Sequence, residues 1–324
     1  MIDIADIEDA ARRLRGIAIE TPLIENYLLN EVAGGRVLLK AECLQRTGSF
    51  KIRGAYNLMS RLSKSEASRG VVAWSSGNHA QGVAEAARLL NMQAAIVMPE
   101  DAPQAKIDNT KRLGGEVILY DRYTGDREKI ARALAAERGV AIVPSYDHNH
   151  IIAGQGTMGL EVAEQMRGLD IRPDQVLICC GGGGLTSGSA VALHARIPGV
   201  QVVAVEPAEF DDTARSFASG KREAIRGSAR SICDALQTPM PGELTFAINQ
   251  SLGVTAALVS DDEVAHAMRF AFRELKLVVE PGGAVALAAV LAGKVATRER
   301  TTVAVLSGGN VDAQLFARIQ SVPD

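Results

Sequence analysis

Short runs of β-branched and apolar residues alternate with longer amphipathic stretches along almost the whole chain of 324 residues. This alternation is typical of repeated strand-helix units, in which successive strands lie parallel in a sheet that helices cover. The predicted strands span residues 36–40, 71–74, 94–98, 116–120, 140–143, 175–180, 200–205 and 301–306. Predicted helices include residues 81–90, 126–138 and 261–275, and Ser260 with Glu263 forms a capping box at the start of the last one. The pattern therefore predicts an α/β fold.

The composition is that of a globular chain with little net charge. Hydrophobic residues make up 47% of the chain, and 35 Lys and Arg residues against 38 Asp and Glu residues leave a net charge of -3. Aromatic residues contribute only 4%, so the clustered basic and aromatic surface of a nucleic-acid-binding protein is not expected. No apolar run is long enough to span a bilayer, and the acidic start from Met1 to Asp6 is unlike a signal peptide.

The cysteine pattern favours a reducing compartment, so we expect a cytoplasmic protein. The four cysteines are Cys43, Cys179, Cys180 and Cys233, and they include no Cys-x-x-Cys pair, which argues against a zinc site. Cys179 and Cys180 end an apolar run and are predicted to be small buried side chains of a strand.

A lysine lies close to a predicted helix start. The segment from Thr47 to Ala55 is a glycine- and serine-containing turn that runs into a helical pattern, with Lys51 between Phe50 and Ile52. Most lysines are solvated surface charges. Partial burial beside these apolar side chains would lower the pKa of the Lys51 amine and make it a usable nucleophile.

Three further motifs combine a strand end with glycine or hydroxyl residues. They are the loop of Ser75, Ser76, Gly77, Asn78 and His79, the turn of Gly181, Gly182, Gly183, Gly184 and Leu185, and the segment from Ser307 to Asn310. The loop and the glycine turn each precede a helical pattern, where free backbone N–H groups bind a carboxylate or phosphate, although a helix cap or tight packing would also explain them. Because ligands of parallel sheets collect at the carboxyl ends of the strands, we expect these motifs to converge on one site.

In the order and spacing of these motifs, and over essentially the whole chain, the sequence resembles the pyridoxal-phosphate enzymes of the tryptophan synthase β fold (fold type II). Within them it is similar to the threonine dehydratase and serine racemase family. The resemblance implies two open, twisted, mostly parallel sheets with flanking helices. It also implies a discontinuous large cofactor-binding domain of residues 1–68 and 148–324, a small mobile domain of residues 69–147, and a homodimer.

The resemblance further implies a role for each motif. Lys51 would carry pyridoxal 5'-phosphate as a Schiff base and remove the substrate α-proton, and Ser76 would be the acid/base on the opposite face of the cofactor ring. Asn78 would bond the ring hydroxyl and Ser307 would face the pyridine nitrogen. Further cofactor contacts would come from Phe50, Gly181, Gly182, Gly183, Gly184 and Leu185. The substrate would contact Ser75, Ser76, Gly77, Asn78, His79 and Arg127, although Arg127 suits an exposed helix face equally well.

These roles predict β-elimination of a small β-hydroxy amino acid (threonine, serine or 3-hydroxyaspartate) to a 2-oxo acid and ammonia, with racemisation as a side activity. A hydroxyl such as that of Ser307 does not hold a proton on the pyridine nitrogen, which favours elimination over deeper carbanion chemistry. Many relatives have Asp-Gly where this chain has Asp234-Ala235. The additional methyl group alters the space for the substrate, so the choice among the three substrates stays open.

A cation site is also implied. In the racemase-like branch of the family, three groups hold a divalent cation. They are an acidic side chain, the backbone carbonyl of the residue four positions after it, and the acidic side chain six positions after it. The matching positions here are Glu206, the Phe210 carbonyl and Asp212. Oxygen ligands suit Mg²⁺ or Ca²⁺, with Mn²⁺ as a further candidate, whereas the alternative is a solvated acidic turn.

Four other functions compete with this interpretation. An amino acid racemase would use the same residues. A nicotinamide dehydrogenase would use glycines 181–188 with Glu206 as the ribose-binding acid, but no register there matches Gly-x-Gly-x-x-Gly. A β-replacement enzyme related to cysteine synthase would usually follow the lysine with Asp-Arg, whereas Lys51 is followed by Ile52-Arg53. A non-catalytic relative would be expected to lack Lys51.

Overall fold

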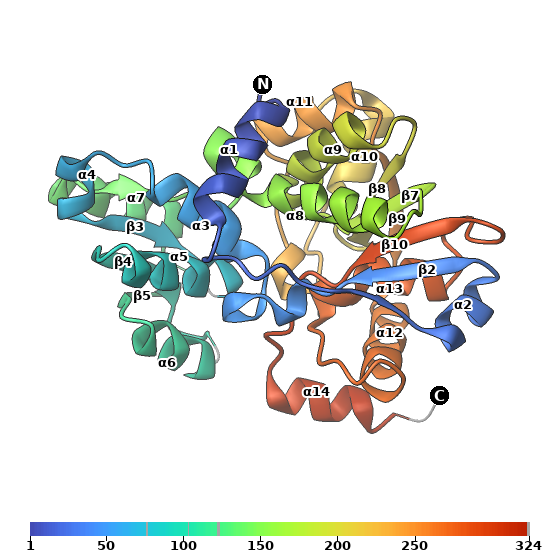
Figure 1. The fold of residues 1–324 in the computed structure, drawn as a ribbon. Helices are drawn as coiled ribbons and strands as arrows, with labels where there is room; N and C mark the ends of the chain where they lie inside the picture. Colours follow the sequence, from blue (N-terminus) through green and yellow to red (C-terminus); the bar gives the residue numbers. More distant parts are fainter. Residues whose placement is uncertain (76, 103, 122–123, 323–324) are drawn as a thin grey trace.

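Two separate sheets form the framework of the protein (Figure 1). The computed structural model describes residues 1–75, 77–102, 104–121 and 124–322. In these residues the larger sheet has the strand order β1-β2-β10-β7-β8-β9 and the smaller one β5-β4-β3-β6. The pairing of β1 with β2 is antiparallel, and the other described pairings are parallel. The predicted class, two mostly parallel sheets with flanking helices, is confirmed.

The strands agree closely with the expected ones. They are β1 (Leu23–Glu25), β2 (Arg36–Lys40), β3 (Val71–Trp74), β4 (Ala94–Pro99), β5 (Glu116–Tyr120), β6 (Ala141–Ile142), β7 (Gln175–Cys179), β8 (Gln201–Pro207), β9 (Thr255–Val259) and β10 (Thr301–Val305). Strands β1 and β9 were not predicted from the sequence. The first has only three residues, and the second contains two alanines, which weaken the β-branched signal.

The helices separate the strands, as the alternation requires. They are α1 (Ile4–Leu14), α2 (Tyr27–Ala33), α3 (Lys51–Met59), α4 (Lys64–Arg69), α5 (Asn78–Leu89), α6 (Gln104–Arg112), α7 (Arg127–Arg138), α8 (Asn149–Gly168), α9 (Gly184–Arg196), α10 (Asp212–Ser219), α11 (Glu243–Ser251), α12 (Asp261–Arg273), α13 (Pro281–Leu291) and α14 (Ala313–Gln320), with short 3-10 turns η1 (Glu42–Leu44), η2 (Arg46–Gly48) and η3 (Asp234–Leu236). The capping box of Ser260 and Glu263 is present at the start of α12. Helix α5 begins at Asn78, three residues earlier than predicted, so Asn78 lies in its first turn.

Each sheet has its own apolar core, and α3 and α8 lie between them (Figure 1). The core of the larger sheet includes buried residues of β2, β7, β8 and β10 together with α13. The smaller sheet packs on α5, and Ile52 of α3 and Ile151 of α8 join that core. The helix that starts at Lys51 therefore contacts elements of both sheets. The division into a large domain and a small mobile domain stays a prediction.

The carboxyl ends of three strands approach one another where the two sheets meet. The loop from Ser75 follows β3, the glycine turn follows β7, and Ser307 follows β10. An antiparallel bridge between Ser49 and Gly308 brings the end of β10 against the turn that precedes Lys51. Parallel strands thus deliver the four motifs to one region. None of the described helices is both long and apolar enough to cross a membrane.

Candidate active site

Lys51 is held at the start of α3 by the turn before it and by the end of β10. Thr47 and Gly48 adopt positive φ values of 64° and 72°, which form a tight turn. The Phe50 N–H donates to the Ser307 carbonyl at 3.2 Å. The Lys51 ammonium donates to the Ser145 carbonyl at 3.1 Å and lies 5.1 Å from the centre of the Phe50 ring. Burial lowers the pKa of this amine from 10.5 to about 8, so the desolvated lysine predicted from the sequence is present.

Two helix N-termini without side-chain caps lie beside this amine. Helix α5 begins after Gly77 and α9 begins after Gly183, and neither of these N-cap residues has a side chain that accepts from the first turn. The first N–H groups of a helix have no partner within the helix, and the helix dipole adds positive potential at the same place. Both ends therefore suit anions. This geometry fits a phosphate at the glycine turn and a carboxylate at the loop before α5.

Side chains packed against the glycine turn explain why it lacks side chains of its own. A β-carbon on Gly182 would lie 2.5 Å from Cδ1 of Tyr146, and one on Gly181 would lie 3.0 Å from the Thr238 hydroxyl. Gly183 adopts a φ of 89°, which L side chains rarely adopt. Only glycine leaves the backbone N–H groups accessible here, so the turn is a cradle that a β-carbon would fill.

Asn78 is fixed from two directions. Its Nδ2 donates to the Glu280 carboxylate, and its Oδ1 accepts from Nδ2 of Asn310 at 2.8 Å. Glu280 is fully enclosed, and burial together with the charge of Asp234 raises its pKa to about 7. These two bonds therefore fix the orientation of the Asn78 amide within the cavity, with its nitrogen toward Glu280 and its oxygen toward Asn310.

His79 and Ser307 complete the inner part of the site. The His79 ring nitrogen Nε2 lies 2.9 Å from the Val143 carbonyl, and burial lowers the pKa of the ring to about 3. The ring is therefore neutral and donates from Nε2, so it brings no positive charge to the loop. The Ser307 side chain is buried and forms a hydrogen bond with Cys179, whose thiol pKa burial raises to about 11.

One cavity of about 520 Å³ joins these groups. Predicted site residues that line it are Phe50, Lys51, Ser75, Gly77, Asn78, His79, Arg127, Gly181, Gly182, Gly183, Gly184, Leu185 and Ser307. Ser76, predicted to be an acid/base, lies outside the described residues. The structure thus brings the lysine, the loop, the glycine turn and the end of β10 together.

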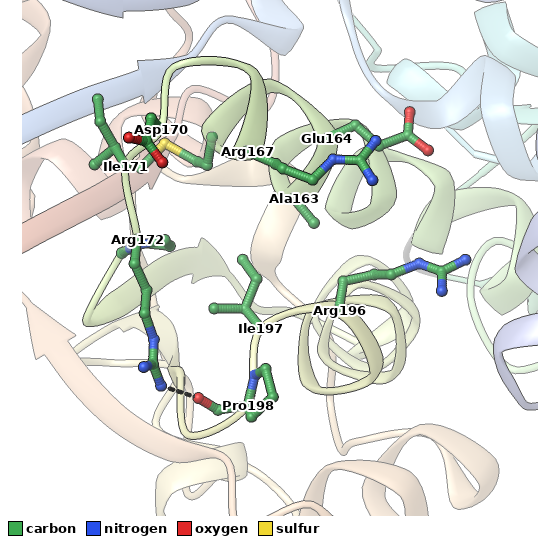
Figure 2. Close-up of a pocket in the computed structure, with 11 residues that line it drawn as sticks. Ala163, Glu164, Arg167, Asp170, Ile171, Arg172, Arg196, Ile197 and Pro198 are labelled. Atoms are coloured by element: carbon green, nitrogen blue, oxygen red, sulfur yellow. Dashed lines mark hydrogen bonds between the residues drawn. The ribbon is translucent and has the colours of Figure 1, made fainter.

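A slightly larger cavity, of about 590 Å³, lies elsewhere (Figure 2). It is formed by the C-terminal part of α8, the segment before β7 and the end of α9, with Arg167, Arg172 and Arg196 at its margin. This is the amino end of β7, opposite the glycine turn. The smaller cavity is therefore the candidate active site, because it contains the strand carboxyl ends and the lysine.

The predicted cation ligands form a separate cluster. Glu206 and Asp212 are both buried, and both Glu206 oxygens cap the start of α10 by accepting from the Thr213 N–H at 3.1 Å and the Ala214 N–H at 2.9 Å. Burial raises the pKa of Glu206 to about 8, with the Asp212 charge as a second cause, and burial raises that of Asp212 to about 7. Among the described residues, no group of three or more His, Cys, Asp or Glu side chains could hold a metal ion. Asp212 Oδ2 is buried without a hydrogen-bond partner, however, which fits a cation held by few carboxylates.

Several lining residues were not predicted from the sequence. They include Lys106, Tyr146, Arg222 and Glu280, and the sequence pointed to Asp234 only through its neighbour Ala235. Glu280 could have been found, because Glu280-Pro281-Gly282-Gly283 follows an apolar run and starts a helix, as the other motifs do. Tyr146 and Arg222 lie in irregular segments without such a signal. Cys179 is buried as predicted and also lines the cavity.

The fold and the cavity together define a class of enzyme. A lysine amine with a lowered pKa and a glycine turn at a helix N-terminus line one cavity at the edge of a parallel sheet, together with the Asn78 amide and the Ser307 hydroxyl. An aldehyde cofactor with a phosphate group requires these elements: an amine for the aldehyde and an anion site for the phosphate.

Comparison with known proteins agrees with this class. A family model described as pyridoxal-phosphate dependent enzyme matches residues 14–308, and the chain belongs to this family. An L-threo-3-hydroxyaspartate ammonia-lyase of Saccharomyces cerevisiae is 43% identical over 98% of this chain and 95% of its own, and a serine racemase of Schizosaccharomyces pombe is 39% identical over 98% and 96%. The crystal structure of a threonine deaminase from T.th. superposes with a TM-score of 0.90 at 41% identity, over 96% of this chain and 99% of that one. The expected resemblance and the pyridoxal-phosphate fold are thus confirmed.

Proposed function

We propose that this enzyme converts a small β-hydroxy α-amino acid to a 2-oxo acid and ammonia by β-elimination. Threonine, serine and 3-hydroxyaspartate are the candidate substrates. The observation that carries the proposal is the Lys51 amine, which faces two uncapped helix N-termini across one cavity. The similar proteins named ammonia-lyase, serine racemase and threonine deaminase act on amino acids of this size.

Lys51 is the proposed catalytic base. Bound pyridoxal phosphate withdraws electrons from the α-carbon of an attached amino acid and so makes the α-proton acidic. With a pKa near 8, the Lys51 amine is in large part neutral at slightly alkaline pH and accepts that proton. The β-hydroxyl takes up a proton and leaves as water. One water later hydrolyses the carbon–nitrogen bond, so the net products are one 2-oxo acid and one ammonia.

The remaining site residues would bind and orient the cofactor and the substrate. The glycine turn of residues 181–184 with Leu185 would hold the phosphate, and Asn78 and Ser307 would contact the ring. The loop from Ser75 to His79 would hold the substrate carboxylate at the start of α5, because His79 is neutral and the helix end supplies the positive potential. Phe50 beside the lysine keeps water from the amine.

Racemisation is a second candidate activity. It requires a proton donor on the opposite face from Lys51, and Ser76 is proposed for this role. The 39% identity to a serine racemase over nearly the whole chain favours this possibility. A chain with both groups would eliminate and racemise the same substrate, in a ratio that depends on how well the serine hydroxyl is positioned.

A divalent cation is proposed at Glu206, Asp212 and the Phe210 carbonyl. Two buried carboxylates, one with an oxygen that has no partner, suit a cation that is completed by water. Mg²⁺ or Ca²⁺ is favoured, and Mn²⁺ is the third candidate. Because this cluster does not line the cavity of Lys51, the cation would stabilise the fold near the end of β8 and not take part in the reaction.

The cellular setting is also a proposal. We infer a cytoplasmic homodimer that binds small amino acids and neither nucleic acid nor membranes. All four cysteines are free and buried, which is compatible with a reducing compartment. The weak net charge and low aromatic content give no support for nucleic-acid binding. We further propose that residues 69–147 move as a small domain over the cavity.

The purified protein tests the main proposal directly. It should be yellow, its visible absorption band should shift on treatment with borohydride, and Lys51→Ala should remove the band. Serine, threonine and 3-hydroxyaspartate stereoisomers should then be scored for ammonia and 2-oxo acid. A colourless protein that binds NAD, or a yellow one that releases no ammonia from any of these substrates, would refute the proposed elimination.

A further inference from the structure

Arg222 occupies a fixed position at the edge of the cavity, in the irregular segment between α10 and η3. The Glu223 N–H donates to the Ser216 hydroxyl at 2.8 Å, and the Ala224 carbonyl accepts from Nη2 of Arg215 at 2.8 Å. Both partners belong to α10, so the residues on the C-terminal side of Arg222 are tied to the fold. Its own Nε donates to the Pro241 carbonyl at 2.9 Å. This bond orients the guanidinium and leaves its two terminal nitrogens for another acceptor.

Two of the arginines that line the cavity have no carboxylate partner among the described residues. Apart from Lys51 and the neutral ring of His79, the basic lining residues are Lys106, Arg127, Arg132 and Arg222, and the acidic ones are Glu128, Asp147, Asp234 and Glu280. Each acid is already engaged: Asp234 pairs with Lys106 at 2.5 Å and Glu128 with Arg132 at 2.6 Å. Asp147 caps α11 by accepting from the N–H groups of Glu243 and Leu244, both at 2.9 Å.

Glu280, the fourth acid, accepts from Asn78. Within the described part of the chain, no carboxylate pairs with Arg127 or Arg222. Two guanidinium groups of one cavity are thus available to an anion from outside.

Tyr146 lies near both of these arginines. Its ring lies against Gly182 of the glycine turn, and its Cβ and backbone lie against Gly184. Burial raises the pKa of the Tyr146 hydroxyl, the charges of Asp147 and Glu128 raise it further, and those of Arg127 and Arg222 act in the opposite direction. Around Lys51, by contrast, the carboxylate that acts on the amine is that of Glu280. The cavity therefore holds, besides the amine, two guanidinium groups near Tyr146 that no described carboxylate pairs with.

A guanidinium pair of this kind is suited to a carboxylate. Arginine offers two parallel N–H donors that match the two carboxylate oxygens, and such charge-assisted bonds are the strong ones. A substrate whose amino group is at Lys51 and whose α-carboxylate is at the start of α5 would extend its side chain from the β-carbon. Only an acidic side chain would gain from the two arginines.

We infer that Arg222 is a specificity-determining residue, which with Arg127 binds the side-chain carboxylate of an acidic β-hydroxy amino acid. This inference rests on the proposed elimination and narrows its substrate to a dicarboxylic one. The name of the yeast relative, L-threo-3-hydroxyaspartate ammonia-lyase, describes a substrate of this class.

Serine and 3-hydroxyaspartate are a matched pair for the test, because they differ by one carboxylate on the β-carbon. Arg222→Gln removes the charge and the two terminal nitrogens and keeps an N–H donor on a shorter side chain. It should lower kcat/KM for 3-hydroxyaspartate roughly 10- to 100-fold, as expected for a lost charge-assisted bond, and change that for serine by less than about threefold. Arg127→Gln should act in the same way, Arg222→Lys should recover part of the loss, and Arg226→Gln, an exposed arginine of the same segment, is the control.

Calorimetry gives a second readout that does not depend on turnover. Succinate should bind more tightly than butyrate, which has a methyl group in place of the second carboxylate, and Arg222→Gln should abolish this preference. An equal loss for serine and 3-hydroxyaspartate would overturn the inference. So would a loss of the visible cofactor band in Arg222→Gln, since Arg222 would then be a phosphate ligand. If the wild-type protein releases no ammonia from any substrate, the elimination itself fails. The inference falls with it, and succinate binding then shows whether a dicarboxylate site exists.

Discussion

The ring of Tyr146 lies where the side chain of residue 182 would have to lie. A β-carbon on Gly182 would come 2.5 Å from Cδ1 of Tyr146, although the two residues belong to different loops. The ring and the glycine turn are therefore packed as one surface. This contact fixes the shape of the proposed phosphate cradle and makes it testable.

Gly182→Ala should force either the ring or the turn to shift. We expect a loss of about 1–3 kcal/mol in the free energy of unfolding, as for other overpacked sites, together with weaker binding of pyridoxal phosphate. Urea unfolding and titration of the visible band measure the two effects. Gly168→Ala is the control, since a β-carbon there meets nothing within 4 Å. Unchanged cofactor affinity in Gly182→Ala would show that the cofactor does not depend on this turn.

The lowered pKa of Lys51 predicts how the cofactor-free protein reacts with pyridoxal phosphate. Only the neutral amine attacks the aldehyde, and burial brings the pKa of the amine to about 8. The rate of attachment should therefore rise about tenfold per pH unit below this value and level off above it. Stopped-flow absorbance over pH 6 to 10 measures the profile. A rate that keeps rising to pH 10, as for an exposed lysine, would contradict the prediction.

A buried ion-pair network should determine much of the stability near Lys51. Arg53 of α3 is fully buried and forms paired bonds with Glu42 at 2.7 and 2.8 Å and with Glu161 at 2.6 and 2.8 Å. Burial opposes charge on these groups. The attraction between the opposite charges outweighs this effect of burial, so the pKa of Arg53 is raised and that of Glu42 is lowered.

Arg53→Met leaves the buried carboxylate of Glu42 without its paired cation, although Glu161 keeps Lys40 at 2.7 Å, and this should cost about 3–5 kcal/mol in the free energy of unfolding. Arg138→Met, which breaks an exposed pair with Glu116, should cost at most about 1 kcal/mol. Denaturant unfolding compares the two variants. Equal small losses in both would mean that the Arg53 network is not a determinant of stability.

The proposed cation should stabilise the native state by mass action. At a free concentration about 100 times its Kd, it should add about 2.7 kcal/mol to the free energy of unfolding, and chelation should remove this gain. Asp212→Asn should abolish the response to added Mg²⁺ or Ca²⁺. Asp211→Asn should keep it, because the neighbouring Asp211 is bound to Arg215 at 2.8 Å. Identical melting after exhaustive chelation and after cation addition would rule out the site.

Much of the framework could be predicted from local patterns. The strands before Ser75, Gly181 and Ser307 were found because each buried parallel strand is a short apolar run that ends at a turn. The helix after Ser260 was found from its capping box. The short strand 23–25 and the alanine-containing strand 255–259 were missed, since pairing in the sheet and not local composition defines them.

The sequence by itself determined the class of fold, the lysine and the glycine turn, because turn geometry and strand periodicity depend on neighbouring residues. Tertiary structure alone decided which distant side chains surround them. Asn78 meets Glu280 across 202 positions, Tyr146 covers Gly182, and Arg222 reaches the cavity from an irregular segment. Contacts of this kind arise from the packing of two sheets against shared helices, and burial then sets the pKa of Lys51 and Glu280, which no local pattern encodes.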